Sequence, residues 1–172
     1  MPDSSQYRVG IKEDAQYKPY VLKRLTDYEP SEKTETSQNL ITEKQLKDDI
    51  FDNIDMLFNS RSHAGLEDLK GYDDVEMSVL GYGITDFCGR QSSTASREAL
   101  RAHILKQLEW FEPRLDSSTV NIELLDTKNS DATSMEYKIS GITRTKEVNK
   151  EISFISKLNL ESGSAELRME NN

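Results

Sequence analysis

The sequence predicts an α+β fold in which N-terminal helices pack on a small antiparallel C-terminal sheet. Before Pro113, apolar residues recur at spacings of three and four, the period of an amphipathic helix. After Pro113 they alternate with polar residues, the period of a half-buried strand. Hydrophobic residues make up 35% of the 172 residues and charged residues 31%. The chain can therefore bury a core of ordinary size in one domain and leave the rest as a tail.

Residues 1–41 are predicted to be a largely extended tail. They are rich in Ser, Glu, Lys, Thr and Tyr and show little periodicity, apart from a short docking segment over residues 20–25. Residues 31–39 read as a polar linker. Residues 42–172 are expected to form a single α+β domain.

The first long helix is predicted to begin after Thr42 and to end near Asn59. Thr42 and Gln45 have the spacing of a capping box, in which each residue satisfies a backbone N–H at the start of the helix. One apolar face follows, made of Leu46, Ile50, Ile54, Leu57 and Phe58.

Residues 60–95 are predicted to be a structured loop, because glycines interrupt them too often for long elements. A short helix is expected near Leu66 to Leu69. A loop of this length is uncommon in a compact domain unless it has a purpose, so it either packs through its own apolar residues or binds something. Those apolar residues are Val75, Met77, Val79, Leu80, Tyr82, Ile84 and Phe87.

A second helix is predicted from Ser96, with Thr94 or Ser96 as its N-cap. Its apolar face consists of Leu100, Ile104, Leu108 and Phe111. Pro113 lacks an N–H and disfavours the α region for the preceding residue, so the helix should stop there and the backbone should become extended.

Glu112 and Arg114 lie two residues apart, a spacing that places side chains of an extended chain on the same side. A carboxylate in the last turn of a helix opposes the helix macrodipole, which indicates a role for Glu112 other than helix stability. The simpler interpretation is a solvated carboxylate offset by Arg114, a surface pair worth about 0–1 kcal/mol.

Three or four antiparallel strands are predicted after Pro113, with turns at residues 128–132 and 161–164. The last two strands should form a hairpin. The apolar positions that should face the helices are Val120, Ile122 and Leu124, then Met135, Tyr137 and Ile139, then Ile152, Phe154 and Leu160, and finally Ala165, Leu167 and Met169.

Composition argues against several classes of function. A net charge of -9 disfavours binding to a phosphate backbone, so no nucleic acid is expected. Cys88 is the single cysteine, which excludes an intramolecular disulfide and suits a small buried residue in a reducing cytoplasm. No apolar run approaches the length of a membrane span and no secretory signal is expected, so membrane insertion is not predicted.

Motifs for metals and cofactors are also missing. His63 and His103 have no partner at ligand spacing, so no metal site is predicted. Gly81 and Gly83 lack the third glycine and the Lys-Ser/Thr of a phosphate loop, which favours a turn. We therefore expect no cofactor.

Glu112 together with Asp86 or Asp74 could form the acid and base of a glycosidase. An acidic chain offers many such pairs by chance, so this stays an alternative.

Four short sequence motifs, in the same order along the chain, resemble motifs of the TssE family, the baseplate wedge subunit of bacterial type VI secretion systems. Residues 22–27 (Leu-Lys-Arg-Leu-Thr-Asp) are similar to the family's Leu-x-Arg-Leu-x-Asp, and residues 57–61 (Leu-Phe-Asn-Ser-Arg) to its Leu-Leu-Asn-Thr-Arg. Residues 78–87 are similar to its Ser-Val-x-x-Tyr-Gly-Leu-Pro-Asp-Leu, with Thr85 in place of the proline. Residues 111–115 match its Phe-Glu-Pro-Arg-Leu completely, and this string is the most specific.

The resemblance implies a non-enzymatic structural subunit with the fold of contractile phage tail wedge proteins. It implies wedge contact through Glu112, Pro113 and Arg114, with TssF and TssG as partners and TssK nearby. The TssB/TssC sheath would begin by strand addition to the terminal sheet, in a cytoplasmic baseplate docked at the inner face of the inner membrane. The alternatives are a peptidoglycan-hydrolysing, lysozyme-like enzyme and an acidic adaptor that binds through its tail.

Overall fold

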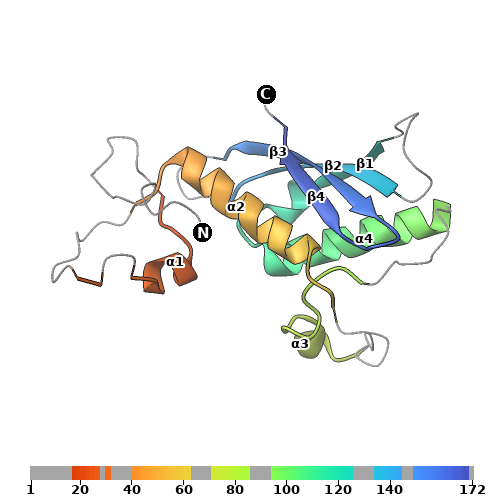
Figure 1. Cartoon of the computed structure of the whole chain (residues 1–172), viewed down its shortest axis with the longest axis horizontal. Coiled ribbons are helices and arrows are strands. Elements are labelled where there is room, and N and C mark those ends of the chain that lie inside the picture. The colour runs from red at the N-terminus through yellow and green to blue at the C-terminus, as the bar shows by residue number, and fades with distance from the viewer. Residues whose placement is uncertain are drawn as a thin grey trace. The chain divides into compact units, whose positions relative to one another are not determined.

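The computed structural model describes residues 17–27, 30–31, 40–62, 71–85, 94–125, 134–144 and 149–170. The chain divides into two compact units, residues 1–50 and 51–172, and each is described by itself. The boundary between the units falls within helix α2, Glu43–Phe58, which is drawn in orange in Figure 1. The predicted division at residue 41 between a tail and a domain stays a prediction.

The first unit contains the short helix α1, Val21–Leu25, where a docking segment was predicted. Lys23 of α1 forms an ion pair with Asp49 of α2, whose side chain is buried. The capping box of α2 is confirmed, because the Thr42 N–H donates to Gln45 Oε1 over 3.0 Å and the Gln45 N–H donates to Thr42 Oγ1 over 3.3 Å. All five residues of the predicted apolar face of α2 are buried.

In the second unit, helix α4 covers Thr94–Phe111 and stops where Pro113 predicts. Its side chains Leu100, Ile104 and Leu108 are buried. The expected extended backbone after the helix is wrong: the Leu115 N–H donates to the Glu112 carbonyl over 3.0 Å, which closes a turn. The physical reason is that the fixed φ of proline suits the second position of a β-turn as well as an extended chain.

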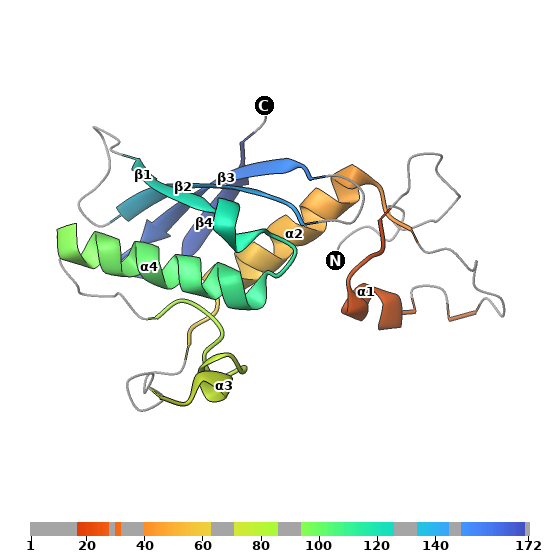
Figure 2. The same ribbon diagram turned by 180° about the vertical axis from the view of Figure 1, so that it is seen from behind.

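A four-stranded antiparallel sheet follows, in the order β1-β2-β3-β4. The strands are β1 (Asn121–Leu125), β2 (Ser134–Ile142), β3 (Glu151–Asn159) and β4 (Ala165–Met169). Figures 1 and 2 show α4 lying across one face of this sheet. Arg101 Nε donates to the Ile122 carbonyl over 3.0 Å, and the Tyr137 hydroxyl donates to the Arg97 carbonyl over 3.4 Å. The predicted α+β class is therefore confirmed.

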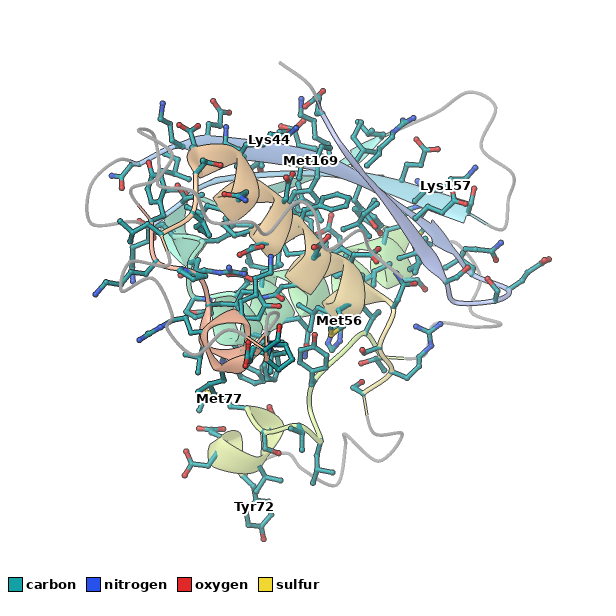
Figure 3. All side chains as sticks on the ribbon, turned by 60° about the vertical axis from the view of Figure 1, so that its left-hand side comes forward. Lys44, Met56, Tyr72, Met77, Lys157 and Met169 are labelled. Carbon is teal, nitrogen blue, oxygen red and sulfur yellow. The ribbon has the colours of Figure 1, made fainter. Side chains whose placement is uncertain are left out.

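In the described part of the loop predicted over residues 60–95, some apolar side chains are buried and others are exposed. Its short helix is α3, Asp73–Glu76, whereas the predicted helix near Leu66 to Leu69 lies outside the described residues. Ile84 is buried and its N–H donates to the Ser60 carbonyl over 2.9 Å. Apolar side chains around α3 stay exposed. Figure 3 shows Tyr72 and Met77 far from Lys157 and Met169 of the sheet. The predicted residues that also fall outside the described ranges are His63, Asp86, Phe87, Cys88 and the turn at 128–132.

Candidate partner-binding site

The turn after α4 brings Glu112 and Arg114 into direct contact. Arg114 Nε donates to Glu112 Oε1 over 2.6 Å, and Arg114 Nη2 donates to Glu112 Oε2 over 2.7 Å. This is the bidentate geometry that gives the strongest carboxylate–guanidinium pairs. Glu112 is only 2% exposed, so the interpretation of this residue as a solvated surface carboxylate is wrong.

The three residues of the predicted wedge contact differ in what they offer to a partner. Glu112 is buried, Pro113 is exposed, and the side chain of Arg114 is 21% exposed. A partner chain can therefore touch Pro113 and the outer part of Arg114. Glu112 fixes the orientation of the Arg114 guanidinium.

Aromatic side chains from α4 and the long loop meet beside this turn. The rings of Tyr82 and Phe111 meet edge to face with centroids 5.1 Å apart, and Trp110 lies against Phe111 at 6.4 Å. Burial raises the pKa of the Tyr82 hydroxyl, and the negative charge of Glu112 raises it further. Tyr82 of the long loop therefore lies close to Glu112.

Two polar residues of α4 hold the loop in place, and sequence reasoning missed the role of both. Gln107 is 2% exposed; its Oε1 accepts from the Gly83 N–H over 3.0 Å and its Nε2 donates to the Gly81 carbonyl over 2.9 Å. His103 Nε2 lies 3.1 Å from the Thr85 backbone nitrogen, which donates to it. The sequence feature that could have indicated this role is the spacing of four residues between His103 and Gln107, which puts both on one helix face beside the apolar stripe.

The glycines of this loop are required for close packing. A Cβ on Gly81 would lie 1.8 Å from the Glu76 carbonyl oxygen, and one on Gly83 would lie 2.6 Å from that of Ser60. Gly83 also has a φ of 110°, which side chains rarely adopt. The Gly81 and Gly83 N–H groups already donate to other residues of the protein, so the structure agrees with a packed turn and not a phosphate loop.

Asn59, at the end of α2, binds the edge of the sheet. Its Nδ2 donates to the Ala165 carbonyl and its Oδ1 accepts from the Ala165 N–H, both over 3.0 Å. Arg61 Nη2 donates to the Ser162 carbonyl over 3.3 Å in the turn before β4. Both residues belong to the string at 57–61, to which sequence analysis assigned no role.

The hydrolase alternative gains no support from this arrangement. Both Glu112 oxygens are engaged by Arg114, so neither is presented to a substrate. Asp74 is exposed on α3, and Asp86 lies outside the described residues. Within the described ranges, no three His, Cys, Asp or Glu side chains gather as metal ligands, and no described helix is long and apolar enough to cross a membrane.

A comparison with protein families identifies the chain. The family described as "Baseplate wedge protein gp25" matches residues 44–148, from the start of α2 to beyond β2. The chain belongs to this family. The same family contains TssE, the type VI baseplate wedge subunit, which confirms the resemblance found in the sequence. No curated protein and no solved structure matches the chain significantly.

Membership assigns the protein a structural role in a baseplate, in association with other baseplate proteins. The matched region includes α4 and the turn at Glu112, Pro113 and Arg114. Strands β3 and β4 lie beyond it.

Proposed function

We propose that this wedge protein is a non-enzymatic subunit of a type VI secretion baseplate that joins the wedge and starts assembly of the contractile sheath. TssF and TssG are its wedge partners, TssK lies nearby, and the TssB/TssC sheath begins on its terminal sheet. The assembly is cytoplasmic and docks at the inner face of the inner membrane. Family membership supports the baseplate part of this proposal.

The observation that carries the wedge contact is the buried Glu112 carboxylate, which holds Arg114 in a proline turn at the surface. A guanidinium fixed by a bidentate pair loses little conformational entropy when a partner covers it, because its rotamer is already set. Pro113 beside it is rigid and exposed. Pro113 and Arg114 together form a preorganised contact, and Glu112 positions it.

The sheath part of the proposal depends on the sheet. An open sheet of four strands has two edges, and unpaired N–H and C=O groups at an edge can accept a strand from another chain.

The wedge contact is tested by co-purification of the full-length protein with TssF and TssG. Arg114→Lys keeps a positive charge beside Glu112 but loses the planar fork, so we expect the yield of wedge complex to fall at least fivefold. Lys47→Ala is the control, because it removes a surface pair with Glu43 at 3.1 Å on α2 and should leave the yield unchanged. An Arg114→Lys protein that folds normally and co-purifies at the wild-type yield would show that the turn is not the wedge contact.

A further inference from the structure

The loop between α2 and α4 carries a cluster of exposed apolar side chains around α3. We propose that residues 72–80, which we call the α3 protrusion, form a second contact with the wedge by inserting into an apolar recess with a basic rim on a partner protein. This inference rests on the proposed function, since it names a further surface for the same wedge partners.

The α3 protrusion concentrates apolar surface that the protein does not bury. Figures 1 and 2 show α3 on the opposite side of α4 from the sheet. Single exposed apolar residues are common on soluble proteins, whereas neighbouring ones mark interaction sites. Four of the ten large apolar residues that are exposed in the described part of the chain belong to the protrusion, namely Tyr72, Met77, Val79 and Leu80. Val79 is 88% exposed, so it contributes almost nothing to the core of its own chain.

Bonds to α4 hold the protrusion in one conformation. Lys106 Nζ donates to Glu76 Oε2 over 2.7 Å at the end of α3. Directly after the protrusion, Gln107 Nε2 donates to the Gly81 carbonyl over 2.9 Å, and the Gly81 N–H donates to the Ser78 carbonyl over 3.0 Å. A segment that is already ordered loses little conformational entropy on binding, so its exposed apolar surface is available for affinity.

The exposed charges of the protrusion are acidic. Residues 71–85 contain no Lys, Arg or His. Glu76 is paired with Lys106, but Asp73 and Asp74 are exposed and take part in no ion pair among the described residues. Complementary charges across an interface guide association and select the partner. The recess that receives the protrusion should therefore carry Lys or Arg at its rim.

Neither a second copy of this chain nor a membrane has the required chemistry. Symmetric pairing of two protrusions would bring Asp73 and Asp74 of both copies together, and such like-charge contacts disfavour association. The anionic surface of a cytoplasmic leaflet attracts Lys and Arg and repels aspartates. The occupant is therefore a different protein.

Lys106 connects the protrusion to the proline turn. It binds Glu76 and also lies over the Trp110 ring, 4.2 Å from the centroid, and that ring meets the ring of Phe111. Lys106 and Pro113 are seven residues apart, about 10 Å along a helix. A standard interface covers about 800 Å² on each partner. A wedge protein that covers the turn is thus large enough to reach the protrusion as well.

The test measures binding of the full-length protein to a purified TssF–TssG complex by surface plasmon resonance. Met77→Ser removes apolar surface from the protrusion, so we expect the dissociation rate to rise about fivefold. Met169→Ser makes the same change at an exposed methionine of β4 and should leave the rate unchanged. If Met77→Ser does not melt at the wild-type Tm, Val79→Ser decides, because its side chain is too exposed to affect folding.

A second set of variants tests the charge of the recess. Asp73→Asn combined with Asp74→Asn removes two charges and keeps the shape of both side chains. Rim charges act mainly on association, so we expect the association rate to fall about threefold and to depend less on salt. Glu161→Gln combined with Glu166→Gln removes two exposed charges near the start of β4 and should change neither quantity.

Photocrosslinking locates the recess on the partner. A benzophenone amino acid in place of Val79 should crosslink to TssF or TssG, at apolar residues with Lys or Arg beside them. The same amino acid in place of Met169 should give no such product.

Four outcomes separate this inference from the proposed function. A wild-type protein that does not bind TssF–TssG would refute both. Wild-type binding that the protrusion variants leave unchanged, while Arg114→Lys weakens it, would exclude the protrusion and keep the proposed function. The reverse result would support the protrusion and exclude the turn. A crosslink from position 79 to a second copy of this chain would overturn the inference.

Discussion

The pair formed by Glu112 and Arg114 should respond unequally to removal of either partner. Arg114→Ala leaves a carboxylate that is 2% exposed without its guanidinium, whereas Glu112→Ala leaves an arginine whose side chain as a whole is already 21% exposed. Breaking a fully buried pair costs about 3–5 kcal/mol, and partial exposure lowers that figure. We therefore expect a loss of about 3 kcal/mol in the free energy of unfolding for Arg114→Ala and about 2 kcal/mol for Glu112→Ala.

The assay is urea and thermal unfolding of the full chain, followed by circular dichroism. At about 2–4 °C per kcal/mol for a chain of this size, Arg114→Ala should lower Tm by about 6–12 °C. The double variant should cost clearly less than the sum of the single ones, because the second substitution removes a group that the first left unpaired. Two results would refute this reasoning. One is that the free energies of unfolding of both single variants lie within about 0.5 kcal/mol of wild type, which is the error of such additivity tests. The other is a larger loss for Glu112→Ala than for Arg114→Ala.

Two further predictions concern how α4 holds the loop. The pKa of His103 is lowered, mainly because the imidazole is buried. The contact with the Gly83 carbonyl raises this pKa by less, and the positive charge of Lys106 lowers it further. The unfolded chain therefore binds the proton more readily, so stability should fall as pH drops below about 6.5, the ordinary value for histidine. His103→Gln should flatten this part of the curve of unfolding free energy against pH; an unchanged slope would show that His103 is not responsible. Gly83→Ala should destabilise by about 1–3 kcal/mol more than Gly71→Ala, because both glycines have positive φ but only Gly83 faces a carbonyl within contact distance. Equal losses of Tm in the two variants would contradict the packing described for Gly83.

Much of the fold could be predicted from the sequence because local signals agreed with the tertiary structure. The capping box at Thr42 and Gln45, the apolar stripe of α4 and the stop before Pro113 are all determined within a few residues. Alternation after Pro113 predicted strands at β1 to β4 for the same reason.

The features that could not be predicted depend on contacts between distant residues. Tyr82 lies near Glu112 and its ring meets that of Phe111, and the periodicity of the sequence cannot show either contact. Asn59 and Ala165 are 106 residues apart in sequence, and only the folded chain brings them together. The helix α3 was also not predicted, since its three acidic residues and one apolar residue carry too little periodicity to mark it.

We propose that a buried glutamate presents Arg114, beside an exposed proline, to another protein of the wedge. The most direct measurement is a density map of the assembled wedge that resolves the side chains of this turn. We expect a partner chain in contact with Pro113 and with the outer part of Arg114, while Glu112 keeps both bonds to the guanidinium. If Pro113 and Arg114 face solvent in the assembled wedge, the turn does not contact another wedge protein and the proposal is wrong.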